Sequence, residues 1–371
     1  MTLKDMIPNV KPTIPIEDIQ PILEDIKSIL ISRKLILGPH LQEFETQFKK
    51  YIGTDVAVGV GSAGTALQLL YQFFDVANKE VVMPALNFIT VANAVIWAGG
   101  KPVFCDTAPD SFLPSLQSLK EKITPRTRGV VLVHITGHIN PEIEEIKAFC
   151  KKNNLFLIED CSHAHGSEYN GVKAGNMCDV GVFSFYPTKV MTSGTGGMVT
   201  TNNKEIENYL LSTRHHGQGK NLMDCQNLGG GWPLTEMAAV LGKYQLKHLE
   251  EWVRKRNAIA DRYNKAFVNH HAIRLILPHG RSAYYKYQVM LAPECKKEEF
   301  IARMEGKGIA CGEVYNPPIH LQPVYQKKFG YTRGMYPNTE AVCKCLVALP
   351  TFVEMKIEEQ DIVINAVKES I

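Results

Sequence analysis

The sequence predicts an α/β protein in which a largely parallel sheet forms a large domain and a smaller α+β domain follows. Short β-branched runs alternate with helical patterns through the first two thirds of the chain, as in βαβ units. The pattern changes after about residue 265. The 371 residues, 45% of them hydrophobic, are enough for about two domains. We therefore expect a large domain over 1–250 and a small one over 251–371.

The βαβ alternation sets the order of elements in the large domain. Strands in such a sheet are short apolar runs, and the helices between them show a 3.6-residue apolar period. The expected strands are 55–60, 80–83, 102–104, 129–134, 155–158, 180–185 and 197–201, and the expected helices are 65–74, 90–98, 116–122, 141–152 and 204–213.

Outside this alternation the chain predicts fewer regular elements. The first fifty residues read as irregular apart from one helix at 16–32. A long proline-free helix at 235–263 is expected to connect the two domains. The small domain is expected to hold strands at 284–291 and 311–314 and helices at 297–307 and 357–369.

Composition excludes several classes of protein. The net charge of +3 and the absence of long like-charge runs give no reason to expect nucleic acid or a membrane surface as a partner. The apolar stretch at 84–100 is too short and too polar to span a bilayer, and the N-terminus lacks a signal-peptide core. Nine cysteines without CxxC spacing fit free thiols in a reducing cytoplasm, so we expect a cytoplasmic protein.

The most informative segment is 183–189, where an apolar strand runs into a proline turn and presents Lys189. Most lysines at strand ends are simply solvated. A lysine amine held in a partly desolvated pocket instead forms Schiff bases with carbonyl groups, including that of pyridoxal phosphate. The glycine-rich turn at 193–197 follows at once.

Asp160 ends another apolar strand, with His163 and His165 just beyond it. A capping role explains such an aspartate as well as a catalytic one does. As a functional group, its carboxylate would face a pyridinium nitrogen and keep it protonated, so that the ring works as an electron sink. His163 would then bond the phenolic oxygen of the ring. The alternative is a metal site made by His-x-His and Asp160 with His134 or His138, but no third ligand has a recognisable spacing.

Residues 59–64 match G-x-G-x-x-G between a strand and a helix. This motif raises an alternative, an NAD-dependent oxidoreductase with a dinucleotide site. The next strand runs into Pro84 without an acidic residue for a ribose, which weakens that alternative. The loop also suits a single phosphate, held by the backbone N–H groups of Ala63, Gly64 and Thr65 at a helix N-terminus, with Ser184 adding a hydroxyl.

Phe88 follows the strand at 80–83 and is either a core residue or a ring that stacks on a cofactor. A phosphate loop, a carboxylate for the ring nitrogen, a stacking aromatic and a lysine together make a coherent pyridoxal phosphate site. None of these elements is specific alone; their order and spacing are.

With these residues in place, the chain resembles the DegT/DnrJ/EryC1/StrS sugar aminotransferases, which have the aspartate aminotransferase fold (fold type I). The resemblance implies that Lys189 forms the Schiff base with the cofactor and that Asp160 faces its ring nitrogen. It also implies a mixed, mostly parallel sheet and a homodimer with composite sites. The matching residues are Gly38, Pro39, Phe44, Glu45, 62–65, 87–94, 102–104, Asp106, 159–166, 183–185, 187–189, Gly196, Gly197 and 318–323.

The family's activity implies a substrate class. We expect amino transfer from L-glutamate, which leaves as 2-oxoglutarate, to a nucleotide-linked 3- or 4-keto-6-deoxy sugar. Such products enter surface polysaccharides, lipopolysaccharide among them, or natural products. Tyr315 and His320 are candidate sugar contacts, and we expect no metal.

Four positions depart from the family pattern, near where a nucleotide-linked sugar would lie. A G-x-N-x-R-like segment usually sends an asparagine to the neighbouring subunit's cofactor phosphate, but Gly231 and Pro233 occupy the asparagine and arginine positions here. Val190 and Thr195 replace the asparagine and glutamate that usually follow the lysine. These changes keep open a nucleotide-free keto sugar, such as 8-oxo-3-deoxy-octulosonate, which would be aminated at C8.

Overall fold

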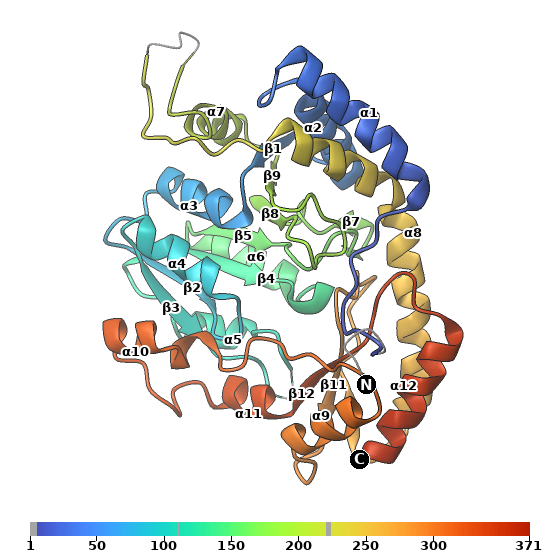
Figure 1. The fold of residues 1–371 in the computed structure, drawn as a ribbon. Coiled ribbons are helices and arrows are strands. Elements are labelled where there is room, and N and C mark those ends of the chain that lie inside the picture. Colours follow the sequence, from blue (N-terminus) through green and yellow to red (C-terminus); the bar gives the residue numbers. More distant parts are fainter. Residues whose placement is uncertain (1–5, 110, 220–223) are drawn as a thin grey trace.

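A seven-stranded sheet forms the centre of the molecule (Figure 1). The computed structural model describes residues 6–109, 111–219 and 224–371. The strand order is β1-β9-β8-β5-β4-β2-β3, so the predicted α/β class is confirmed. The strands are β1 (Val56–Val60), β2 (Glu80–Pro84), β3 (Lys101–Cys105), β4 (Thr127–Val133), β5 (Phe156–Asp160), β8 (Val180–Ser184) and β9 (Gly197–Thr201).

One strand runs against the others. The pairs β2–β3, β2–β4, β4–β5 and β5–β8 are parallel, whereas β9 is antiparallel to both of its neighbours, β8 and β1. Four of the strands, β1, β2, β5 and β9, are buried along their whole length, as expected for a sheet covered on both faces. Because β1, β2, β4, β5 and β8 share a direction, their carboxyl ends meet at one edge of the sheet, where ligands of such sheets bind.

Three of the helices between the strands, α3, α5 and α7, begin close to the predicted positions after a residue whose side chain caps them. Ser62 Oγ accepts the Thr65 N–H at the start of α3, and Asn203 caps α7 in the same way. A short hairpin of β6 (Glu168–Tyr169) and β7 (Val172–Lys173) lies between β5 and β8. The helical segments of this part are α3 (Ala63–Phe73), α4 (Ile89–Trp97), α5 (Leu116–Lys120), the 3-10 turn η2 (Ile135–Gly137), α6 (Ile143–Lys152) and α7 (Lys204–Thr213).

The N-terminal fifty residues hold two helices, so the expectation of one helix in an irregular segment is wrong. Helix α1 (Ile16–Ser32) matches the prediction, and α2 (Pro39–Ile52) was missed. Helix α2 has proline in its first turn and ends at a left-handed Gly53. The buried Glu236 carboxylate accepts three N–H groups at the start of α2, those of Gly38, His40 and Leu41, at 2.9–3.0 Å. Figure 1 shows α1 and α2 packed beside the first half of α8.

The C-terminal part is built on a three-stranded antiparallel sheet of order β10-β11-β12. The predicted strand at 311–314 is wrong, because only Gly312 pairs there, in an isolated bridge with Ala348. The sheet instead uses two strands that were not predicted, β10 (Ile273–Leu275) and β12 (Leu346–Leu349). The other elements are α8 (Glu236–Phe267), β11 (Tyr287–Leu291), α9 (Lys297–Gly306), the 3-10 turn η3 (Ile319–Leu321), α10 (Pro323–Phe329), α11 (Pro337–Cys345) and α12 (Ile357–Ser370).

The N-terminal segment lies against this C-terminal part (Figure 1). Ile7 forms a parallel bridge with Ile309, and Asn9 Nδ2 donates to the Ala348 carbonyl at 2.8 Å. Because α8 continues without a break through residue 250, the division there stays a proposal. None of the described helices is long and apolar enough to cross a membrane.

Candidate active site

A cavity of about 520 Å³ opens at the carboxyl edge of the central sheet. The carboxyl ends of five strands or the loops that follow them, and two segments from the C-terminal part, contribute to its walls. The structure brings together nine of the predicted site residues in this one cavity: Ala63, Gly64, Thr65, Phe88, Asp160, His163, Ser184, Lys189 and Tyr315.

The turn between β1 and α3 forms a cradle for an anion. Ala63 and Gly64 head the helix, and no acceptor in the described part of the chain takes their backbone N–H groups, whereas the Thr65 N–H is used by the Ser62 cap. Strand β9 starts directly beside this turn, and a Cβ at Gly197 would lie 2.5 Å from the Ser62 carbonyl carbon and 2.6 Å from the Ala63 nitrogen. Glycine is therefore required at position 197 to bring β9 so close.

Lys189 is presented by a tight turn after β8. Its backbone N–H donates to the Tyr186 carbonyl at 3.0 Å, and its Nζ lies 4.7 Å from the centre of the Tyr285 ring. Burial lowers the pKa of the Lys189 ammonium group to about 8, against an upward contribution from Asp160. An amine with this pKa is deprotonated to a useful extent near neutral pH, which a nucleophile or proton carrier requires.

Asp160 is the last residue of β5 and is only 5% exposed. Its Oδ1 accepts the Ser162 N–H at 2.9 Å, which fixes the carboxylate and opens the chain into the loop that bears His163. Asp160 therefore does cap the segment that follows β5, and the same carboxylate also lines the cavity.

His163 has both ring nitrogens engaged. Nδ1 accepts the Thr136 N–H at 3.2 Å, and Nε2 lies 2.9 Å from the Tyr315 hydroxyl. Burial holds the pKa of His163 well below its usual value, so the ring is neutral with its proton on Nε2. The ring also stacks on Tyr285, with centroids 4.3 Å apart.

The metal alternative receives no support from His163, because both of its nitrogens already bond to protein groups. Among the described residues, the side chains with metal-ligand spacing are His134, Glu159 and Cys161. Glu159 there accepts N–H groups from Gly175, Met177 and Cys178 and pairs with His134. Its carboxylate is thus already fully engaged with protein groups.

Phe88 and Tyr315 form an aromatic wall of the cavity. Their ring centroids are 5.7 Å apart, and Phe88 is 50% exposed, so it is not a core residue. Phe88 is held at the start of α4, where it is the N-cap residue. An exposed aromatic ring fixed at a helix start is suited to stacking on a planar ligand.

The structure places His320 elsewhere. It is fully buried, its Nε2 bonds to Glu340 at 2.9 Å, and it is not among the residues that line the cavity. The structure therefore does not support the prediction of His320 as a sugar contact. Sequence reasoning missed the lining residues Gln68, Asn87, Trp97, Tyr186, Thr188 and Tyr285.

The comparison with protein families identifies the family of proteins to which this chain belongs. The model of the DegT/DnrJ/EryC1/StrS aminotransferase family matches residues 17–368. The chain belongs to this aminotransferase family.

Individual relatives of the chain agree with the family match. A Campylobacter jejuni UDP-4-amino-4,6-dideoxy-N-acetyl-beta-L-altrosamine transaminase is 33% identical and covers 87% of each chain. The structure of DesV from S. venezuelae has a TM-score of 0.90 at 29% identity, over 97% of this chain and 98% of that one. A Streptococcus pneumoniae protein solved in its PMP form has a TM-score of 0.90 at 25% identity, over 98% and 97%. The chain is thus a pyridoxal phosphate-dependent sugar aminotransferase, which replaces the NAD-linked alternative.

The cavity fits pyridoxal phosphate. The anion cradle with its two available N–H groups suits a phosphate, and the Gly197 approach leaves no room for a side chain there. Asp160 and Lys189 lie on neighbouring loops of the same cavity, so one ring can meet both.

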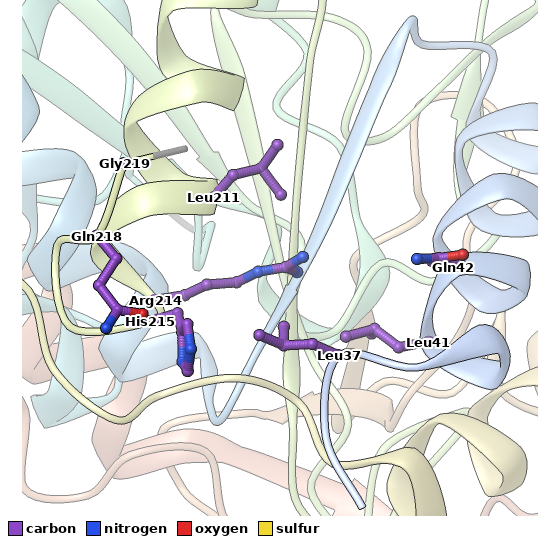
Figure 2. Close-up of a pocket in the computed structure, with 8 residues that line it drawn as sticks. All are labelled: Leu37, Leu41, Gln42, Leu211, Arg214, His215, Gln218 and Gly219. Atoms are coloured by element: carbon purple, nitrogen blue, oxygen red, sulfur yellow. The ribbon is translucent and has the colours of Figure 1, made fainter. Parts of the chain in front are cut away.

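The segment that departs from the family pattern lies next to the cradle. The Gly61 N–H donates to the Trp232 carbonyl at 2.8 Å, and Pro233 bridges Val60. Gly231 pairs with His215, one of the residues around a second, smaller cavity of about 210 Å³. Figure 2 shows Arg214 reaching into this second cavity from the end of α7.

Proposed function

We propose that the protein transfers the amino group of L-glutamate to a keto sugar, with a nucleotide-linked 3- or 4-keto-6-deoxy sugar as the main candidate. The observation that supports this proposal most directly is the placement of Lys189, Asp160 and the Ala63–Gly64 cradle around one cavity. When bound, pyridoxal phosphate supplies the electron sink that lets the amino-acid carbon lose a proton.

Each residue has a proposed role in that reaction. Lys189 bonds the cofactor and carries the proton between the reacting carbons, and its lowered pKa supports this role. Asp160 holds the ring nitrogen in its charged form. Both ring nitrogens of His163 are bonded to protein groups, so its proposed role is indirect: Nε2 holds the Tyr315 hydroxyl, which can then donate to the ring oxygen. The phosphate is bound by Ala63, Gly64, Thr65 and Ser184, and Phe88 stacks on the ring.

A nucleotide-free keto sugar is the second candidate, and the charges around the cavity favour it. The described residues that line the cavity include one cation, Lys189, and no arginine. A nucleotide diphosphate is normally bound by arginine or lysine. Gly231 and Pro233 also lack the side chains that the family pattern places there. An octulosonate oxidised at C8 would need no diphosphate site.

We further propose a homodimer. Helix α1 exposes Ile16, Ile19, Leu23 and Leu30, whose spacing of three, four and seven residues places them along one face. Exposed apolar side chains continue from α1 to Leu35 and Ile36, before α2. Such a face is best covered by a second copy of the chain. The nine free cysteines support our proposal of a cytoplasmic location, and amino-sugar supply for surface polysaccharide such as lipopolysaccharide is the proposed use.

The cofactor bond provides the first test. Purified protein should be yellow, and borohydride should bleach it and leave a pyridoxyl group on the peptide that contains Lys189. A colourless protein that borohydride does not label would contradict the proposal.

The substrate needs a separate test. The pyridoxamine-loaded protein is mixed with candidate keto sugars, and the return of the yellow colour is followed. We expect return with nucleotide-linked keto sugars. Return with nucleotide-free sugars alone would establish the second candidate instead.

A further inference from the structure

Among its described lining residues, the active-site cavity has no cation that is free to bind a substrate carboxylate. Lys189 is the one cation among the described lining residues, and the proposed reaction occupies it with the cofactor. L-Glutamate and 2-oxoglutarate each bring two carboxylates. A carboxylate that is taken out of water needs a cation or several N–H donors.

Lys286 is a second cation beside the cavity, on the chain just before β11. Its Nζ lies 5.9 Å from the centre of the Tyr285 ring, the same ring that lies 4.7 Å from Lys189 Nζ. The two amines therefore face one shared side chain, and Tyr285 itself lines the cavity. The electrostatic influence of Lys286 lowers the pKa of both Lys189 and His163, as expected of a charge close to both.

The ammonium group of Lys286 has donors available. Nζ donates to the Glu313 backbone carbonyl at 2.9 Å, and no ion pair joins it to a carboxylate among the described residues. The Glu313 carboxylate is already committed, to Lys297 and to Asn316 Nδ2. A lysine ammonium has three N–H donors, so two remain for a ligand. Partial burial makes them stronger donors to an anion than they would be in bulk water.

The distances suit a dicarboxylate amino acid. From its amino nitrogen to its distal carboxylate carbon, glutamate spans about 5 Å, because four bonds of about 1.5 Å separate the two atoms. An ion pair to that carboxylate adds about 2.8 Å. Both Nζ atoms lie within 6 Å of the Tyr285 ring centre, so the two amines are no more than about 11 Å apart. The length of glutamate is of the same order, which allows a donor that reacts beside Lys189 to extend a carboxylate toward Lys286.

We propose that Lys286 binds a carboxylate of the amino donor, L-glutamate, and of its product, 2-oxoglutarate, and so selects an acidic amino donor. The proposal rests on the donor named under Proposed function. It assigns Lys286 to substrate binding and leaves the chemistry at Lys189.

Binding of glutarate to the cofactor-loaded protein tests the proposal without turnover. Glutarate carries the two carboxylates of the donor but no amino group. Calorimetric titration should show Lys286→Met weakening glutarate binding by roughly 10- to 100-fold, the range of a lost charged hydrogen bond. Lys286→Arg should recover most of the affinity. Lys296→Met, a matched change at an exposed lysine, should bind like the wild type.

Turnover of L-glutamate provides the second measurement. In Lys286→Met the KM for L-glutamate should rise by roughly the same factor, with kcat changed less than about threefold, because a ground-state contact is lost. A kcat loss with unchanged KM and unchanged glutarate affinity would overturn the proposal and leave Lys286 as an electrostatic neighbour of Lys189. If thermal unfolding shows that Lys286→Met does not fold, Lys286→Arg decides the question. A folded Lys286→Arg that fails to bind glutarate would also overturn the proposal.

The wild type separates this proposal from the proposed function. If borohydride labels Lys189 but the wild type neither binds glutarate nor converts L-glutamate, the donor is wrong and the proposal for Lys286 falls with it. If the wild type converts L-glutamate and Lys286→Met does so with the same KM, the function stands and the proposal for Lys286 is wrong.

Discussion

Two regions of the molecule meet at the turn between β1 and α3, and they are built in different ways. In the active-site cavity, the groups with chemical roles follow the ends of strands, each within a few residues, as Asp160 and Lys189 do. Residues 214–219 and 224–235 are held by long-range contacts instead, such as Arg214 Nη1 to the Gly59 carbonyl at 2.9 Å. The reaction is thus encoded in short local patterns, whereas the surroundings of the substrate depend on how distant segments meet.

The largest effect is expected in the first region, from Lys189→Ala. Removing the amine removes both the bond to the cofactor and the proton carrier, so we expect activity to fall by at least about 10⁴-fold. The cofactor-free variant should unfold at no lower a temperature than the wild type, because burial lowers the pKa of the Lys189 amine and its charged form therefore does not stabilise the fold near neutral pH. Steady-state kinetics with L-glutamate and a keto sugar measure the loss.

Lys204→Ala is the control for this change, since Lys204 pairs with Glu207 on the exposed side of α7. Full activity in Lys204→Ala with a tenfold or smaller loss in Lys189→Ala would show that Lys189 is not the reacting amine.

In the second region, replacing Arg214 should lower the stability of the protein rather than the rate of the reaction. Arg214 and Glu45 form an ion pair in which their side chains are 8% and 14% exposed. Arg214→Met leaves the Glu45 carboxylate buried and without its cation, so the free energy of unfolding should fall by about 3–5 kcal/mol. Denaturant unfolding measures this loss, and Arg254→Met on the exposed face of α8 is the control.

Restoring neutrality sharpens the same test. The double change Arg214→Met with Glu45→Gln should recover part of the lost free energy, because no unpaired charge then stays buried. If the double variant is as unstable as the single one, packing of the arginine stem explains the effect and the ion pair does not.

The lowered pKa of Lys189 should produce a pH dependence of intermediate size, both in the reactivity of the amine and in the stability of the fold. In the cofactor-free protein, reductive methylation of Lys189 should have its midpoint near pH 8, because the amine is protonated and unreactive below that pH. Between about pH 8 and the ordinary value of 10.5 the unfolded chain binds more protons than the folded one. The contribution of Lys189 to stability therefore rises with pH in this window.

Asp160→Asn changes the midpoint in a defined direction. Asp160 raises the pKa of Lys189, so its neutralisation should move the methylation midpoint below pH 8. Mass spectrometry of the peptide that contains Lys189 reads the midpoint in both proteins. An upward shift, or a midpoint above pH 10 in the unmodified protein, would contradict the burial of this amine.

The same contrast explains what could be predicted from the sequence. Lys189, Asp160 and the Ala63–Thr65 turn were predictable, because each sits at the end of an apolar run whose direction the βαβ pattern fixes. Tyr285 was not, since it reaches the cavity from the C-terminal part and no local pattern marks it.

The missed and mistaken elements have different causes. Helix α2 was readable, with Pro39 at its start, Gly53 at its end and buried residues spaced by three and four. The strand predicted at 311–314 fails because β12 takes the place beside β11, which leaves Gly312 one bridge. Local β-propensity does not show which of two apolar segments pairs in a sheet.

The smallest loss of activity is expected from changes at Tyr285, where the hydrogen bond of the hydroxyl can be separated from the contacts of the ring. Its hydroxyl lies 2.9 Å from Thr188 Oγ1, and its ring contacts His163 and Lys189. Tyr285→Phe removes one hydrogen bond, worth about 1 kcal/mol, so we expect about a fivefold loss of kcat/KM. Tyr285→Leu also removes the ring and its cation–π contact, worth about 0.5–2 kcal/mol more. Steady-state kinetics should therefore rank the leucine variant below the phenylalanine variant. Equal losses would mean that the hydroxyl alone positions the lysine turn, and that the aromatic face toward Lys189 contributes nothing.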